Sequence, residues 1–315
     1  MHIRSVRETD IGNELCQSLL MRLWRLVIAI FLGTLLAGAP AQADDYTISS
    51  VRDGLYRFTA GNSHSMFWVT DDGIVVIDTI NGEAASWLKS ELQNRFELPV
   101  RYVIYSHNHF DHIYGAEVFD DPGTVFVAHE LARADIVRSK AQTRVPDITF
   151  TDELSVHLSG QTLRLRYHAT NNRRGSISML FEDQRVLFVV DWIVVGRMPW
   201  KDLEGYDIEG VIRSTDDVLL LDWDVFVGGH AKIGDRDDVK RYLDYLEALY
   251  AAVSDGMIAG KSLEMLQEEI RLDEYSDLKN YPEWLPLNVA GVYRTLADQS
   301  YLLKRPETPP PGDAR

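Results

Sequence analysis

Short apolar runs come in two blocks, each followed by helical patterns, and no other feature restricts the fold of this 315-residue chain as strongly. In the first block, turn residues separate the runs, which is typical of antiparallel strands. The predicted strands of this block span 55–58, 66–69, 74–78, 100–105 and 124–128. Residues 83–95 and about 130–139 have the spacing of apolar side chains that favours helices.

The second block repeats this order of strands and helices. Its predicted strands span 154–158, 162–167, 177–181, 186–190 and 225–227, and its predicted helices span 208–221, 235–254, 261–271 and 285–302. Two mixed sheets packed face to face, with helices outside, would satisfy such a duplicated layout. We therefore expect an α/β fold, a four-layer αββα sandwich with extra C-terminal helices, as one domain over residues 44–304. The proline-rich tail 305–315 is predicted to be unstructured.

Residues 1–43 are predicted to be an N-terminal extension and a signal peptide. Arg22 and Arg25 precede the apolar run 26–36, and Ala41-Gln42-Ala43 forms a small-residue cleavage site. The run is shorter than the ~20 residues that span a bilayer, which disfavours the alternative of a membrane anchor. We expect export to the periplasm or the medium, without stable membrane insertion after cleavage. Acidic residues before Met21 fit a signal peptide poorly, so Met21 is the expected start.

Charge and cysteine content exclude several kinds of protein. The chain has 32 Lys and Arg against 48 Asp and Glu, a net charge of −16, whereas binding to a phosphate backbone needs clustered basic residues. We therefore expect no nucleic-acid partner. The single cysteine, Cys16, excludes an internal disulfide framework and a cysteine-rich zinc ribbon. A metal site in this chain must consist of His, Asp, Glu or Asn.

A dense group of such residues follows the predicted strand 100–105. The segment from Tyr105 reads Tyr-Ser-His-Asn-His-Phe-Asp-His and places three histidines and one aspartate within six residues. His107 and His109 are two residues apart, so an extended loop directs both to the same side. Imidazole and carboxylate groups suit zinc or iron, and we interpret the segment as a metal site rather than a polar surface loop. We expect structural roles for the isolated histidines His64, His129 and His157.

The motif His107-x-His109-x-Asp111-His112 resembles the signature of the metallo-β-lactamase-fold hydrolase superfamily. The layout of residues 46–302 is similar to the αββα sandwich of that family. The resemblance implies that His107, His109 and a third histidine hold one metal ion. It implies that Asp111, His112 and His230 hold a second ion, and that Asp191 contacts both. It also implies that Asp78 orients a ligand through a hydrogen bond.

The chain departs from this family pattern in the loop 170–175, where the third histidine is expected and Asn172 stands instead. Asparagine offers a neutral oxygen and is a poorer zinc ligand than imidazole. The neighbouring Arg173 and Arg174 add positive charge, which disfavours a cation there, unless the loop is simply solvated. We therefore expect the chain to bind one or two zinc ions, with a metal content nearer one than two per chain. Iron and manganese are the alternative metals. His168 is the nearest histidine and a less favoured substitute ligand.

The resemblance implies a hydrolase in which a metal-activated water attacks a small-molecule substrate. The expected electrophile is an ester, lactone, thioester or β-lactam carbonyl. Asp111 and Asp191 are the predicted catalytic residues, which would orient the nucleophile or move a proton. The alternative is a binding protein that keeps the fold and one metal but has lost hydrolysis with Asn172. Four aromatic residues either line the mouth of the site or pack in the core: Trp68, Phe110, Trp192 and Trp200.

Overall fold

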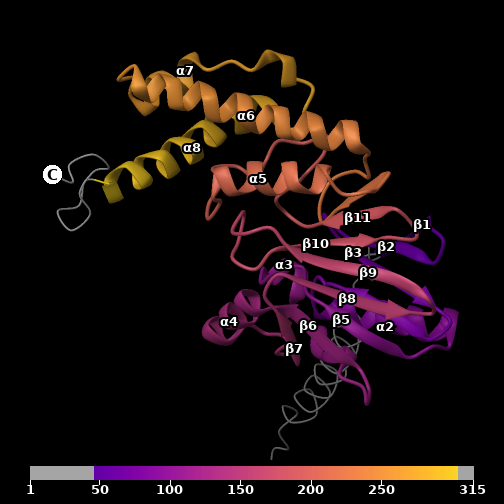
Figure 1. Ribbon diagram of the computed structural model, residues 1–315. Helices are drawn as coiled ribbons and strands as arrows, with labels where there is room; N and C mark the ends of the chain where they lie inside the picture. The colour runs from indigo at the N-terminus through magenta and orange to yellow at the C-terminus, as the bar shows by residue number, and fades with distance from the viewer. Residues whose placement is uncertain (1–45, 304–315) are drawn as a thin grey trace, which may run out of the picture. The chain divides into compact units, whose positions relative to one another are not determined.

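The computed structural model describes residues 46–303 and contains two mixed β-sheets (Figure 1). The larger sheet has seven strands in sequence order, antiparallel from β1 to β4 and parallel from β4 to β7. Its strands are β1 (Tyr46–Arg52), β2 (Leu55–Ala60), β3 (Ser63–Thr70), β4 (Gly73–Ile77), β5 (Val100–Ile104), β6 (Val125–His129) and β7 (Ile148–Phe150).

The smaller sheet has five strands in the order β12-β11-β10-β9-β8. Strand β12 runs parallel to β11, and the other neighbours are antiparallel. Its strands are β8 (Glu153–Leu158), β9 (Gln161–Tyr167), β10 (Ile177–Phe181), β11 (Val186–Val189) and β12 (Val225–Gly228).

The two sheets pack face to face because alternate side chains of their strands point into a shared core. In β4, Val75 and Ile77 belong to this core, whereas Ile74 and Val76 face the helices on the other side. The rings of Trp68 on β3 and Phe181 on β10 join the sheets edge to face, with centroids 5.7 Å apart. Strands buried on both faces read as continuous apolar runs, as the sequence does here.

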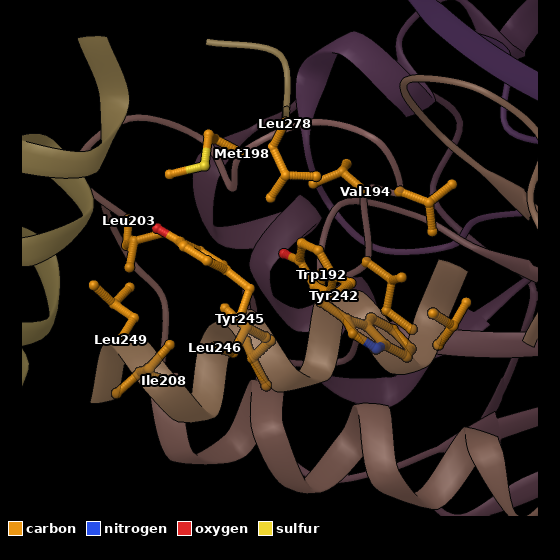
Figure 2. Packing of buried hydrophobic residues seen from close by; sticks show 14 of the residues in the cluster. Trp192, Val194, Met198, Leu203, Ile208, Tyr242, Tyr245, Leu246, Leu249 and Leu278 are labelled. Carbon is orange, nitrogen blue, oxygen red and sulfur yellow. The ribbon is translucent and has the colours of Figure 1, made fainter. Parts of the chain in front are cut away.

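Helices cover the outer face of each sheet, which completes the four layers. Side chains of α2 (Gly82–Phe96) and α4 (Glu130–Ser139) pack on the larger sheet. Side chains of α5 (Ile208–Leu219) and α6 (Arg236–Ile258) pack on the smaller sheet, in the cluster that Figure 2 shows around Trp192. Beyond α6, the chain forms α7 (Leu263–Glu269), a 3₁₀ turn at Asp273–Tyr275 and α8 (Tyr281–Leu303). The predicted αββα sandwich with extra C-terminal helices is confirmed.

Several details of the prediction differ from the structure. The sequence prediction gave no bounds for β1 and missed β7, because β7 has only three residues and two of them are exposed. Helix α8 begins at Tyr281, four residues earlier than predicted, although it contains Pro286. The predicted signal peptide 1–43 and the tail 305–315 lie outside the described residues. Within the described part of the chain, no helix is long and apolar enough to span a bilayer.

A close backbone contact fixes the short helix α3 (Phe110–Ile113), which carries part of the histidine motif. The backbone N–H groups of Thr79 and Ile80 both donate to the carbonyl oxygen of His112 at 2.7 Å. Just after α3, Gly115 adopts a φ of +78°, and a Cβ at this position would lie 2.3 Å from the Cα of Gly82. Glycine at position 115 therefore allows α3 to lie against the start of α2.

We expect Gly115→Ala to lower the free energy of unfolding by at least about 2 kcal/mol, because the methyl group would overlap the backbone of Gly82 and strain the left-handed φ. Gly123→Ala is the matched control, because Gly123 has a φ of +96° and a methyl group there would meet no atom within 4 Å. This control should lose only the conformational part, about 1 kcal/mol. Urea unfolding of both variants measures the difference, and equal losses would contradict the contact.

Candidate metal centre

Polar side chains gather where strands of both sheets end. Asp78 directly follows β4, and the histidine motif follows β5, its parallel neighbour. Asp191 and His230 each come two residues after the parallel strands β11 and β12. Because parallel neighbours end at the same edge of a sheet, the chain delivers these groups to one region. The polar residues that follow strands of the larger sheet thus lie close to those that follow strands of the smaller sheet.

One group of three potential ligands consists of Asp111, His112 and His230, whose ligand atoms lie within 4.8 Å of one another. The Nε2 atoms of His112 and His230 are 3.2 Å apart, and each lies 3.2 Å from Oδ1 of Asp191. Oδ2 of Asp111 lies 3.7 Å from His112 Nε2 and 3.6 Å from His230 Nε2. The structure therefore brings together the whole set predicted for the second ion.

The other oxygen of Asp191 faces the remaining two histidines of the motif. Its Oδ2 lies 2.6 Å from His109 Nδ1 and 3.1 Å from His107 Nε2. Asp191 itself has a φ of +71°, and the hydroxyl of Tyr206 donates to its carbonyl oxygen at 3.0 Å. The carboxylate of Asp191 thus lies between the two predicted ligand sets, with one oxygen toward each.

The donor groups around Asp191 Oδ1 fit a divalent cation. Among the described residues, no group forms a hydrogen bond to this buried oxygen, although two imidazole nitrogens lie 3.2 Å from it. His230 Nδ1 contacts the carbonyl oxygen of Asn62 at 2.7 Å. A carbonyl oxygen only accepts, so Nδ1 carries the hydrogen and Nε2 presents a lone pair. Imidazole lone pairs with carboxylate oxygens are a donor set for zinc and similar ions.

Electrostatics favour positive charge at this point. Burial would raise the pKa of the Asp191 carboxyl, but His112 and His107 outweigh burial and hold this pKa well below its ordinary value. Burial would lower the pKa of His112, but the carboxylates of Asp191, Asp78 and Asp111 together outweigh burial and raise it to about 9. Burial lowers the pKa of His107 to about 3, and the neighbouring His109 adds to this effect. The carboxylate of Asp191 therefore stays ionised and attracts a cation.

A buried aspartate supports the ligand loop from behind. Asp78 accepts hydrogen bonds from the backbone N–H of Ser106 at 2.9 Å and from its hydroxyl at 2.6 Å. Because that hydroxyl donates to Asp78, it accepts from His107 Nδ1, 2.8 Å away, and His107 Nε2 is left with its lone pair. Asp78 also lies 3.8 Å from Nδ1 of His112. It acts on His107 through Ser106.

The loop that lacks the third histidine has two distinct parts. Asn172 is fully buried, its Oδ1 accepts from the hydroxyl of Ser176 at 2.9 Å, and its Nδ2 has no partner among the described residues. Arg173 instead reaches His109, with 2.5 Å between Nε and the Nε2 of the histidine. Arg174 is exposed. The sequence predicted that the charge of Arg173 disfavours a cation, but it did not predict this contact.

The structure does not bring His168 into either ligand group. Its Nε2 lies 2.7 Å from the hydroxyl of Ser178, and its Nδ1 lies 3.3 Å from a carboxylate oxygen of Asp217. Both ring nitrogens thus contact side chains outside the two groups of potential ligands found among the described residues. One group is Asp111, His112 and His230, and the other is His107, His112 and Asp191. The isolated histidines also have local partners. They are Thr59 and Ala231 for His64, Thr151 and Leu131 for His129, and Thr162 for His157.

The four aromatic residues separate into two pairs. Trp68 and Trp192 are fully buried and belong to the core. Phe110 is 66% exposed and Trp200 is 49% exposed. Phe110 stands between His109 and Asp111 in the sequence, so of the four aromatic residues it is the one adjacent in the chain to candidate ligands.

Residues 58–230 match the family model described as the metallo-beta-lactamase superfamily. Among curated proteins, the chain is 26% identical over 240 residues to 2,4-dinitroanisole O-demethylase subunit alpha of Nocardioides sp. (strain JS1661), covering 75% of this chain and 70% of that protein. It is 24% identical over 221 residues to subunit beta of the same strain, covering 69% of each.

Solved structures with a similar fold include a lactamase and a sulfatase. A metallo-beta-lactamase from Pontibacter korlensis has a TM-score of 0.59 at 21% identity, covering 64% of this chain and 99% of that one. A double mutant of the sec-alkyl sulfatase PisA1 has a TM-score of 0.65 at 18% identity, covering 82% of this chain and 50% of the sulfatase. At these identities, the likeness concerns the fold alone.

We expect Asp78→Asn to weaken binding of Zn²⁺, used as the probe ion, by about 10- to 100-fold, because it removes the carboxylate that lies 3.8 Å from Nδ1 of His112, one of the ligands of the second set. Asp72→Asn is a matched control, since Asp72 accepts from the N–H and the hydroxyl of Ser159 on an exposed turn. Competition with a chromogenic chelator measures the affinity. An Asp78→Asn protein that binds as tightly as the control would refute the supporting role.

Proposed function

Because the chain belongs to the metallo-β-lactamase superfamily, we propose that it is an exported zinc-dependent hydrolase of a small-molecule substrate. The observation that supports this proposal best is the convergence of His112, His230 and Asp191 Oδ1 on one point, with 3.2 Å between each pair of ligand atoms. A divalent cation held there lowers the pKa of bound water and polarises an oxygen of the substrate.

The two predicted catalytic aspartates differ in exposure, and this suggests different roles. The side chain of Asp111 is 37% exposed, whereas that of Asp191 is 11% exposed. Asp111 can therefore meet a water molecule or a substrate and accept a proton from it. Asp191 is enclosed by imidazoles and serves to hold the ligand sets together. The exposed ring of Phe110 offers an apolar surface beside Asp111.

We propose a carbonyl substrate, that is an ester, a lactone, a thioester or a β-lactam. The names of the relatives add two compounds to be tested beside these. The curated relatives are subunits of an O-demethylase for 2,4-dinitroanisole, and one structural neighbour is a sec-alkyl sulfatase. A test panel therefore contains the four carbonyl classes, 2,4-dinitroanisole and a secondary alkyl sulfate.

A non-catalytic binding protein is the second candidate. The position expected for the third histidine holds Asn172, and the next residue, Arg173, contacts His109. Both features weaken the first ligand set and favour a protein that keeps the fold but not the reaction. Turnover of the panel by the zinc-loaded protein distinguishes the two candidates, because a binding protein would bind without turnover.

We expect the zinc-loaded protein to hydrolyse at least one member of the panel and to lose this activity with a chelator. His230→Ala should lower kcat/KM and zinc affinity by at least about 100-fold, because it removes one of the converging ligand atoms. His157→Ala is the matched control, since His157 is exposed and its ring is hydrogen-bonded to Thr162, away from the ligand groups. Activity that survives both the chelator and His230→Ala would refute metal-dependent hydrolysis.

We propose export from the arrangement of Arg22, the apolar run 26–36 and Ala41-Gln42-Ala43. Expression of the full chain in a Gram-negative host should yield a shortened protein in the periplasm or medium whose mass corresponds to a start at Asp44. Fractionation followed by mass spectrometry measures both properties. Full-length protein in the cytoplasm would contradict export, and Ile30→Arg, which places a charge within the apolar run, provides the export-deficient reference.

A further inference from the structure

The hydrogen-bond partners of His109 determine where this ring carries its hydrogen. Nε of Arg173 lies 2.5 Å from His109 Nε2, and Oδ2 of Asp191 lies 2.6 Å from His109 Nδ1. A guanidinium group has only donors, so it requires a lone pair on Nε2. The neutral ring then carries its hydrogen on Nδ1, from which it donates to Asp191. The three side chains form one chain of hydrogen bonds, from Arg173 through His109 to Asp191.

This arrangement conflicts with metal binding by His109. A histidine that binds a metal through Nδ1 carries its hydrogen on Nε2 and donates it to an acceptor such as a carboxylate or a carbonyl oxygen. Arg173 cannot accept that hydrogen bond, and two N–H groups would then face each other. While Arg173 is in place, His109 is therefore a hydrogen-bond donor to Asp191 and offers no lone pair there.

The position of Arg173 is fixed by the surrounding loops. Nη1 lies 3.5 Å from the carbonyl oxygen of Glu204, and the guanidinium group lies against Gly205. Gly205 has a φ of +79°, and a Cβ there would lie 1.5 Å from Nη1 of Arg173. Two residues before Arg173, the carbonyl oxygen of Asn171 accepts from the backbone N–H of Asp207 at 2.7 Å. The segment around Gly205 thus packs against the guanidinium group and holds it in place.

We propose that Arg173 is a positioning residue that removes His109 from the ligand set and restricts the centre to one ion, held by Asp111, His112, His230 and Asp191. The proposal rests on the proposed function, since it assumes that the second ligand set binds zinc. It differs from the effect of Asn172, because a histidine restored at position 172 would still lack His109 as a partner. The guanidinium group supplies positive charge beside His109, a residue that the family pattern assigns to the other ion.

The test compares zinc content in variants that share the restored histidine. Asn172→His alone should bind close to one zinc per chain, because Arg173 still requires the lone pair of His109 Nε2. Asn172→His with Arg173→Gln should bind close to two, with the second ion at least about tenfold tighter than in the single variant. Glutamine has an oxygen that can accept from His109 Nε2–H, and it carries no charge.

Two further variants separate hydrogen-bond chemistry from general disturbance of the loop. Asn172→His with Arg173→Lys keeps a group that only donates, and it should stay close to one zinc. Asn172→His with Arg174→Gln removes the same charge from the exposed neighbour and should also stay close to one. Elemental analysis after gel filtration and calorimetric titration with Zn²⁺ give the stoichiometry and the affinity. Thermal unfolding confirms that each variant is folded.

The unaltered protein provides a second readout through nitrogen NMR of labelled histidines at one zinc per chain. We expect the hydrogen of His109 on Nδ1, whereas a hydrogen on Nε2 would overturn the proposal. Two zinc ions in Asn172→His alone or in its Arg173→Lys combination, or one in its Arg173→Gln combination, would also overturn it. A parent protein that binds no zinc would instead refute the proposed function, so the two failures are distinguishable.

Discussion

The buried carboxylate of Asp191 is the group on which the arrangement of the site depends. It faces four imidazole rings, and its two oxygens divide them into two pairs. Burying an ionised carboxylate is unfavourable unless positive charge or hydrogen-bond donors surround it. His109 supplies such a donor, and His112, whose pKa is raised to about 9, supplies positive charge. Asp191 itself has a left-handed φ, and the hydroxyl of Tyr206 donates to its carbonyl oxygen. The strained backbone directs the carboxylate between ligands of both sheets.

Groups behind the ligands decide which nitrogen of each ring is available. The carbonyl oxygen of Asn62 selects Nε2 of His230, and the pair Asp78 and Ser106 selects Nε2 of His107. Arg173 has the opposite effect on His109, because it donates where the other two partners accept. The metal-binding capacity of the site is therefore determined as much by these neighbours as by the ligands.

Most of the fold could be predicted from sequence because apolar periodicity reports directly on burial. The continuous apolar run of β4 indicates a strand covered on both faces, and the histidine motif stands where β5 ends. The contact between Arg173 and His109 could not be predicted, because it depends on how a distant loop packs. Only the missing Cβ of Gly205, 32 residues further along the chain, leaves room for the guanidinium group. The edge strand β7 was missed because it has only three residues, too few for an apolar period to be recognised, and two of them are exposed.

The ligands of the candidate centre come from both halves of the sandwich. His112 follows a strand of the larger sheet and His230 follows a strand of the smaller one, and the two residues are 118 positions apart in the sequence. An unfolded chain holds no such site, so an ion can be captured only after the halves have docked. Binding then adds to the free energy of unfolding, by about 4 kcal/mol at a thousandfold excess of free ion over Kd. The bound ion would act as a cross-link between the sheets. Because the site forms only on folding, the metal that is bound would be the one available in the compartment where folding is completed.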